Sequence, residues 1–540
     1  MSALLASAPT EASSITNLAA SGGVLAQSDG AESGILKSIE DGINTVFDPI
    51  TTAVSEFVFY EINIFGAQFP WIVAWLILGA TVFTIYFGFI QFRNIRLALQ
   101  LVRGKYTKGD EPGEISHFQA LSSALSGTVG MGNVAGVGVA VTIGGAGATF
   151  WMIVAGLLGM CTKFVECTLG VKYREVHEDG TVSGGPMHYL RKGVAERLGG
   201  SKGRIIGTGL AVGSALMLLL FAFAGGNMLQ ANQTFAQLRD VTGGDDGFLG
   251  NDGAALIFGI ILALVVGAVI IGGIKSIGKV TSRLVPAMTI IYVAASLIVI
   301  LTNIVDVPAA FEAIVRGAFA PESVAGGAIG AMIVGFQRAA FSNEAGLGSA
   351  PIAHSAVKTK HPATEGLVAL LEPFVDTVVI CTMTALTIVI ANPAFWVEAQ
   401  ETVQAGGEVP DGVTVTSEAY GTVLPGFPYV LTVAVVLFAV STIITWGYYG
   451  QKSWTFLFGK SRRAERTYQV VYVLLTVCGT VLTLGAVLDF ADAMVFMSAL
   501  FNIAGLYILA PVVKREVKAW KAKVRSGEIK KLNKADKISR

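Results

Sequence analysis

SGTVGMGNVAGVG, residues 126–138, places five glycines, a threonine and an asparagine inside a long apolar stretch. Glycine costs a helix about 1 kcal/mol relative to alanine, so this cluster favours an interruption of the helix. A second stretch, GFQRAAFSNEAGLGSAP at residues 335–351, combines glycines and a proline with the charged Arg338 and Glu344. Close packing of neighbouring helices through small residues would explain either stretch alone. Together they predict two interrupted helices.

The composition indicates a membrane protein. Of 540 residues, 53% are apolar and 14% charged, whereas soluble proteins carry about 25% charged residues. Runs of about 20 apolar residues are long enough to cross a bilayer as helices. We therefore predict an all-α polytopic membrane protein and no enzyme, because paired His, Cys or acid motifs at helical spacing are missing from the sequence. The eleven expected spans are 71–92, 115–143, 147–172, 205–238, 254–274, 281–304, 322–352, 364–391, 425–450, 467–488 and 490–513.

The distribution of basic residues predicts the orientation. Of the 38 Lys and Arg residues, 33 fall in alternate connecting segments and in the C-terminal tail, and the segments on the opposite side are acidic. Cytoplasmic loops carry the excess of Lys and Arg. We therefore expect the N-terminus outside and the C-terminus inside.

The regions outside the spans have their own expected roles. Residues 1–33 should be a flexible segment, and 34–70 an amphipathic segment lying at the membrane surface. The span at 71–92 would be a peripheral helix. The basic tail, residues 514–540, would contact anionic lipid, and nucleic-acid binding is not expected.

The two interrupted spans lie five spans apart, at matching positions. An odd offset means that they enter the membrane from opposite faces, so residues 115–304 and 322–513 would be inverted repeats. This arrangement is typical of secondary transporters, whose discontinuous helices form a site near the midplane.

Four stretches carry a resemblance to a known family: GTVGMGNVAGV, GNMLQANQ, AAFSNEAGLGSAPIAHSAVKT and STIITWGYYG. The chain resembles the alanine/glycine:cation symporters from about residue 70 to 515. The resemblance implies a LeuT-like five-plus-five inverted repeat with one extra N-terminal helix. It also implies uptake of alanine and glycine coupled to sodium, with D-alanine or glutamine accepted by some relatives.

Such a substrate has a carboxylate and an ammonium, and a broken helix can bind both. The second half of the first broken span should present free N–H groups near Gly132 to a carboxylate, and the first half should present carbonyls around Gly127 and Gly130 to sodium or ammonium. Asn133 could contact either end of the substrate or simply cap the helix. Thr128 could offer its hydroxyl to sodium or bond back within its own helix.

The remaining site residues follow from the resemblance and the fold that it implies. Ser441 and Thr442 become candidate sodium ligands, and Thr442 also a substrate contact. Trp446 would cap a small substrate, with a role as interfacial anchor as the alternative. Three further candidate substrate contacts are Gln230, Phe336 and Gln337, of which Phe336 could instead be an ordinary core aromatic.

Other polar residues are assigned structural roles. We expect Arg338 and Glu344 to pair with each other, or one of them with Glu372 or Asp376, as a clamp or gate. A proton-coupled role for these acids is the alternative. The five histidines should lie in solvated loops, and the four cysteines should be buried without disulfides or metal.

The sequence thus predicts a sodium-coupled importer of small neutral amino acids in the cell membrane, or inner membrane, of a prokaryote. A symporter for glutamine or a D-amino acid, or a proton-coupled one, is the first alternative. A channel or a transport-inactive sensor is the second. The oligomeric state is left open.

Overall fold

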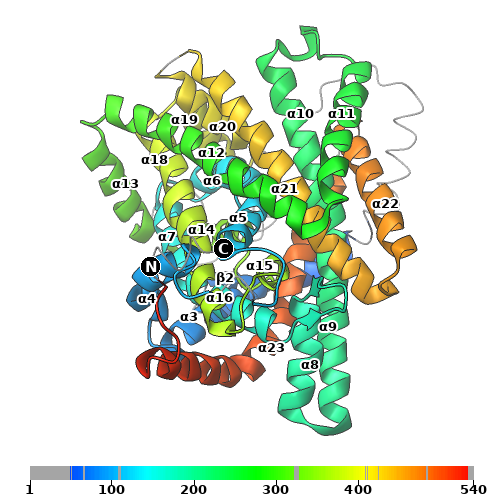
Figure 1. Cartoon of the computed structure of the whole chain (residues 1–540). Helices are drawn as coiled ribbons and strands as arrows, with labels where there is room; N and C mark the ends of the chain where they lie inside the picture. The colour runs from blue at the N-terminus through cyan, green and yellow to red at the C-terminus, as the bar shows by residue number, and fades with distance from the viewer. Residues whose placement is uncertain are drawn as a thin grey trace.

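The protein is described here from a computed structural model. It describes residues 49, 51–64, 67–107, 111–320, 327–407, 409, 412–423, 425–481 and 485–532. These residues are mostly helical, with two short two-stranded antiparallel hairpins (Figure 1). The expected flexible segment, 1–33, lies outside the described residues.

The N-terminal region differs in part from expectation. Residues 51–58 are helical, and β1 (Glu61–Ile64) then pairs with β2 (Ala67–Pro70). The peripheral helix α3 (Trp71–Tyr86) stops short of the expected end at residue 92. Left-handed backbone at Gly88 (φ 63°) and Phe89 (φ 55°) turns the chain by 77° into α4 (Ile90–Val102). The surface location of residues 34–70 remains a prediction.

The first expected repeat is built around an interrupted helix. Two residues separate the helix α5 (His117–Thr128) from α6 (Met131–Ile143), and the two helix axes differ by 44°. The following elements are α7 (Gly147–Lys172), β3 (Glu175–Val176), β4 (Val182–Ser183), α8 (Pro186–Leu198), α9 (Gly200–Phe223), the π-helix η1 (Ala224–Met228), α10 (Leu229–Val241), the 3₁₀ turn η2 (Gly244–Asp246), α11 (Asp252–Ile270), α12 (Gly273–Thr302) and α13 (Val307–Phe319).

The second expected repeat is also interrupted. Between α14 (Gly327–Asn343) and α15 (Ala350–His354), the backbone is left-handed at Glu344, Gly346 and Gly348. The following elements are α16 (Pro362–Ala369), α17 (Leu371–Pro373), the π-helix η3 (Phe374–Cys381), α18 (Thr382–Ala391), α19 (Ala394–Gln404), α20 (Gly412–Gly421), α21 (Phe427–Phe458), α22 (Arg462–Val481) and α23 (Gly485–Arg525). Both predicted interruptions are therefore present.

Many helices are long and apolar enough to cross a bilayer. Among the described residues there are seven such helices, or up to nine if the bent pairs α3–α4 and α5–α6 each count as one span. The two expected spans that this count does not include, 322–352 and 467–488, contain α14 and α22. The count of eleven therefore stays a prediction.

The interrupted helices lie in the middle of the molecule. In Figure 1, α5, α6, α14 and α15 are surrounded by the longer helices α7, α12, α21 and α23. By contrast, α11 carries many exposed apolar side chains, among them Ile257, Ile261 and Leu264, as expected of a helix that faces lipid.

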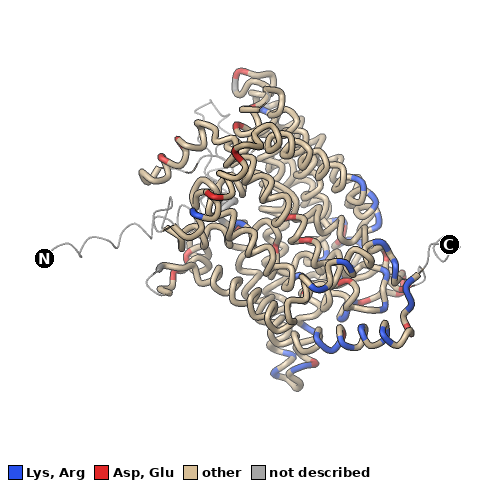
Figure 2. The backbone as a smooth tube through the Cα atoms, turned by 90° about the vertical axis from the view of Figure 1, so that its left-hand side faces the viewer, with Lys and Arg blue, Asp and Glu red and all other residues tan. Residues whose placement is uncertain are grey.

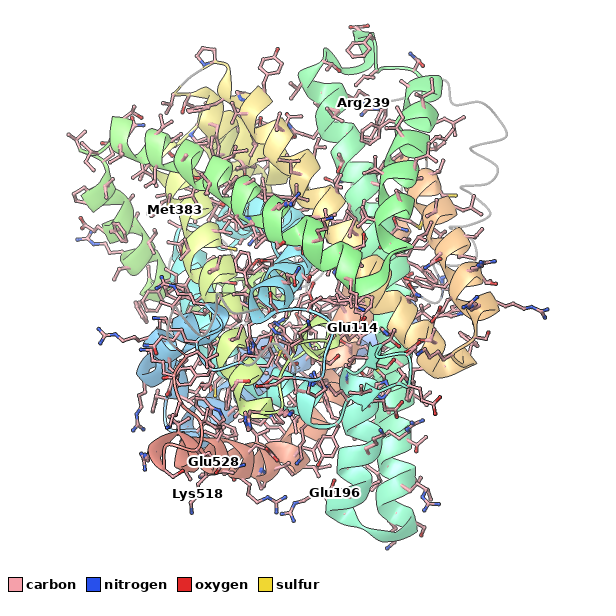
Figure 3. The ribbon with its side chains drawn as sticks, in the orientation of Figure 1. Glu114, Glu196, Arg239, Met383, Lys518 and Glu528 are labelled. Atoms are coloured by element: carbon pink, nitrogen blue, oxygen red, sulfur yellow. The ribbon has the colours of Figure 1, made fainter. Side chains whose placement is uncertain are left out.

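The basic residues are distributed unevenly over the molecule. Figure 2 shows Lys and Arg gathered toward one side of it. In Figure 3, Glu196, Lys518 and Glu528 lie at the end opposite to Arg239.

Candidate functional site

The break between α5 and α6 is held open by one side chain. In a continuous helix, the N–H of Gly130 would bond to the carbonyl of Ser126. Instead, it donates to Oδ1 of Asn133 over 2.8 Å. The carbonyl of Ser126 is thereby released from the backbone ladder.

This free carbonyl meets two hydroxyl groups from α21. Oγ1 of Thr442 donates to the carbonyl oxygen of Ser126 over 3.1 Å, and Oγ of Ser441 lies 3.3 Å from the same oxygen while it donates to the carbonyl of Phe438 over 2.9 Å. Oγ of Ser126 donates in return to the carbonyl of Ser441 over 2.8 Å. All three residues are buried. The structure thus brings the candidate ligands Ser441 and Thr442 to the end of α5, and adds Ser126, which the sequence analysis missed.

The other candidate sodium ligands take different positions. The hydroxyl of Thr128 bonds back to the carbonyls of Ala124 and Leu125 over 3.5 and 3.4 Å, which was its alternative role. A Cβ on Gly127 would lie 3.1 Å from the side chain of Thr445, so this glycine lets α5 approach α21 closely.

Gly130 lies between two polar side chains. A Cβ at this position would be 2.8 Å from Oγ1 of Thr442 and 3.7 Å from Oε1 of Gln230. Gln230 donates its amide N–H to the carbonyl of Gly225 over 3.1 Å. Its Oε1 is buried and has no hydrogen-bond partner among the described residues. Gln230 therefore presents an unpaired acceptor to the break.

Asn133 joins the start of α6 to the second broken helix and to η3. While Oδ1 caps the helix, Nδ2 lies 3.0 Å from Oγ of Ser342 and 2.7 Å from Oδ1 of Asp376. Gly132 allows this approach, because its Cβ would lie 3.3 Å from Cα of Ser342. Both ends of the Asn133 amide are therefore engaged, and in this conformation it acts as the cap that was its alternative role.

The aromatic residues differ in part from expectation. Trp446 is 1% exposed and packs against Phe221, with ring centroids 4.5 Å apart, so it is a buried residue and the interfacial alternative is wrong. Phe336 is placed elsewhere: it packs against Trp151 and lines a cavity of about 30 Å³ between α3, α7 and α14. Phe341 instead reaches the break, 3.5 Å from a Cβ on Gly132.

Gln337 remains a buried residue of α14 whose contact with a substrate is untested. It is 2% exposed, and its Oε1 has no partner among the described residues.

The buried charges pair differently from expectation. Glu372 is bound by Lys163 of α7, with Nζ 2.8 Å from Oε1, and not by Arg338 or Glu344. Glu344 accepts from the hydroxyl of Ser349. Arg338 lies within electrostatic range of Asp492 on α23.

Glu166 of α7 also supports the second break, because its carboxylate accepts from the N–H of Gly348 and from Nδ2 of Asn502. The sequence signal for Lys163 and Glu166 was their charge inside an apolar span.

The expectation that all histidines lie in solvated loops is wrong. His117 and His354 are 2% and 0% exposed, and both bind the carboxylate of Glu365, the latter over 2.6 Å. His188 is buried as well, at 6% exposure. The Glu365 carboxylate, which lies 248 residues after His117, compensates for the lost hydration of the imidazoles.

A second clamp lies beside these histidines. The guanidinium of Arg174 donates to the carbonyls of Pro112, Ser355, Val357 and Thr359 over 2.6 to 2.8 Å. Arg174 follows α7, Pro112 precedes α5, and the other three residues follow α15. Arg174 therefore connects the end of α7 to the segment before α5 and to the segment after α15. Glu114, labelled in Figure 3, accepts at its Oε1 a hydrogen bond from the N–H of Val182 over 2.7 Å.

No group of three or more His, Cys, Asp or Glu residues in the described part of the chain could hold a metal ion. Carbonyl and hydroxyl oxygens are the groups that converge at the first break.

The chain was compared with known proteins. The sequence profile of the sodium:alanine symporter family matches residues 52–534. The sodium/alanine symporter AgcS of Methanococcus maripaludis is 38% identical over 459 residues, which cover 84% of this chain and 95% of that protein. The probable sodium/glutamine symporter GlnT of Bacillus subtilis is 31% identical over 450 residues, 83% of this chain and 87% of that protein. The solved structure of MhsT in complex with L-phenylalanine is 18% identical, with a TM-score of 0.49, and the match covers 73% of this chain and 89% of that one.

Proposed function

The chain belongs to the sodium:alanine symporter family, and from this premise we propose that it imports alanine and glycine together with sodium. It is a multi-pass membrane transporter with bacterial and archaeal relatives, and not an enzyme. Its class of activity is cation-coupled amino-acid transport.

The observation that carries the proposal is the carbonyl of Ser126, which the break in α5 frees and which lies 3.3 and 3.1 Å from the hydroxyls of Ser441 and Thr442. Backbone carbonyls and hydroxyls bind Na⁺ in transporters whose helices are broken at the midplane. A sodium ion held by these oxygens would join α5 to α21, and its departure would let the two helices separate. Sodium binding and alternating access would thus be linked at one contact.

The substrate would bind at the start of α6. The N–H groups of its first turn and the positive end of its dipole suit the carboxylate of an amino acid. The free Oε1 of Gln230 suits the ammonium, and the rings of Phe341, Phe221 and Trp446 offer an apolar surface that suits a small side chain. Alanine and glycine fit this description best.

We place this site in an eleven-span architecture, a LeuT-like pair of inverted five-helix repeats with α3 as the extra helix. The clustering of Lys and Arg toward one side supports a cytoplasmic C-terminus (Figure 2).

Glutamine is the second candidate substrate, because one relative is named a sodium/glutamine symporter. The proposal is tested by uptake of labelled alanine into proteoliposomes under sodium, lithium and proton gradients, with L-alanine, D-alanine, glycine and glutamine as competitors. We expect saturable uptake that requires sodium and that glycine inhibits. Uptake driven by a proton gradient without sodium would contradict the coupling, and inhibition by glutamine alone would contradict the substrate.

A further inference from the structure

Asp376 is a fully buried carboxylate whose partners are all neutral. It lies in η3 at 0% exposure. Its Oδ1 accepts from Nδ2 of Asn133 over 2.7 Å, and its Oδ2 accepts from the hydroxyls of Ser342 and Thr377, each over 2.8 Å. Within the part of the chain that the structure describes, no Lys, Arg or His forms an ion pair with it.

The surrounding hydrogen bonds indicate which form of the carboxyl group this site accommodates. Oγ1 of Thr377 accepts from Nδ2 of Asn343 over 2.9 Å, and Oγ of Ser342 accepts from Nδ2 of Asn133 over 3.0 Å. Each hydroxyl therefore has its own hydrogen left to donate to Asp376. Three donors directed at one carboxyl group are the arrangement that an ionised carboxylate requires.

Among the other buried acids beside the breaks, Glu166 and Glu344 also bond to neutral groups, whereas two acids lie against a basic side chain. Glu372 is paired with Lys163, and Glu365 lies between two histidines. An ionised Asp376 would have no counter-charge within hydrogen-bond distance among the described residues. An uncompensated charge at membrane depth is costly, and such residues mark the pathways of ions and substrates.

We propose that Asp376 supplies the negative charge for a monovalent cation that binds beside the start of α6 during transport. The inference rests on the proposed function and extends it to a second cation contact, distinct from Ser441 and Thr442. Oδ1 has one acceptor position free beyond its bond to Asn133, and the hydroxyl oxygens of Ser342 and Thr377 complete an oxygen-rich surface. The cation is a sodium ion or the ammonium of the amino acid, which share this chemistry.

The same side chain links this contact to the helix break. Asn133 bonds to Asp376 through Nδ2 and caps Gly130 through Oδ1. A cation at the free position of Oδ1 would weaken the bond between Oδ1 and Nδ2 of Asn133, and a shift of this amide would move the cap and the carbonyl of Ser126. Binding at Asp376 would therefore be coupled to the sodium site at the end of α5.

The test compares the parent protein with Asp376→Asn, which keeps the shape and removes the charge, and with Asp306→Asn, a control at an exposed acid. Binding of radioactive sodium to the purified proteins is measured without amino acid, and alanine uptake is measured in proteoliposomes. If the cation is sodium, Asp376→Asn should weaken sodium binding by roughly tenfold or more, whereas Asp306→Asn should match the parent. If it is the ammonium, sodium binding should stay as in the parent and the KM for alanine should rise by a similar factor.

A second variant covers the case in which Asp376→Asn does not fold. Ser342→Ala keeps the carboxylate and removes one donor, and it should shift the same affinity in the same direction by a smaller factor. Parent-like affinities for both ligands in a folded Asp376→Asn protein would overturn the inference. So would the loss of only the pH dependence of uptake, because Asp376 would then bind a proton. Failure of the proposed function would give a different result from failure of this inference, because the parent protein itself would then take up alanine independently of sodium.

Discussion

Nδ2 of Asn133, on the first broken helix, lies 2.7 Å from Oδ1 of Asp376, 243 positions later in the chain. Through its other end the same amide caps Gly130. One side chain therefore fixes the geometry of the first break and contacts the buried acid beside it.

Replacing Asn133 by alanine should affect both functions of this amide. It leaves the N–H of Gly130 without its acceptor and removes one donor from Asp376, a loss of about 1–3 kcal/mol for each buried group left unpaired. We expect a lower thermal midpoint and alanine uptake reduced by roughly tenfold or more. Asn303→Ala, which removes an amide outside the break, should match the parent. Near-normal uptake by Asn133→Ala would rule out its role.

Two glycines of the stretch 126–138 should differ in how well they tolerate replacement by alanine. A Cβ at Gly130 would lie 2.8 Å from Oγ1 of Thr442, whereas a Cβ at Gly136 would meet nothing within 4 Å. Gly130→Ala should separate α5–α6 from α21 and abolish sodium-dependent uptake. Gly136→Ala should transport normally and gain up to about 1 kcal/mol of helix stability. Equal uptake by the two variants would argue against close contact at Gly130.

Lys163 should be essential for stability. Lys163→Met breaks a buried ion pair and leaves Glu372 with only the imidazole of His354, 3.6 Å away, beside it; breaking a buried pair typically costs about 3–5 kcal/mol. We expect a large fall in the thermal midpoint of the detergent-solubilised protein. The double variant Lys163→Met, Glu372→Gln should recover much of it, because no charge then remains unpaired. A double variant no more stable than the single one would show that the ion pair is not the cause.

The contacts of His117 and His354 with Glu365, here called the histidine clamp, should restrain α5. Cys167 is packed among Ala124, Ala350 and Ala369, in the region where His117 ties α5 to α16. His117→Ala removes a hydrogen bond to a carboxylate, worth about 1.5–3 kcal/mol, and should raise the rate of alkylation of Cys167 roughly tenfold or more.

Mass spectrometry of the alkylated chain would measure this rate. Cys478, which is exposed and not buried as the sequence predicted, serves as internal reference. The matched control is His188→Ala, which removes the His188–Glu175 contact of 3.6 Å outside this clamp. Equal reactivity of Cys167 in all three proteins would show that the clamp does not restrain α5.

The sequence was most informative where local chemistry determines structure. Glycine clusters weaken helices wherever they occur, so both breaks could be placed before any packing was known. The end of α3 was missed because a continuous apolar run does not reveal the reversal at Gly88 and Phe89.

The rotation of α14 could not be read from its sequence. Phe336 and Phe341 are five positions apart, which places them on different faces of a helix with 3.6 residues per turn. Only the packing of Gly132 against α14 shows that Phe341 faces the break. The long-range pairs, such as Lys163 with Glu372 and His117 with Glu365, could not be predicted either, because they depend on how the helices pack. Their partners lie more than 200 positions away.

The most direct test of the account is the sodium dependence of alanine uptake in Ser441→Ala, Thr442→Val and Thr455→Val proteoliposomes. Thr455 lies on the same helix, and within the described part of the chain its hydroxyl bonds to the carbonyls of Gln451 and Lys452 in its own helix. We predict that the first two variants need roughly tenfold more sodium for half-maximal uptake, as expected for the loss of about 1.4 kcal/mol of binding, and that Thr455→Val matches the parent. An unchanged sodium requirement in both Ser441→Ala and Thr442→Val would contradict a sodium site between α5 and α21.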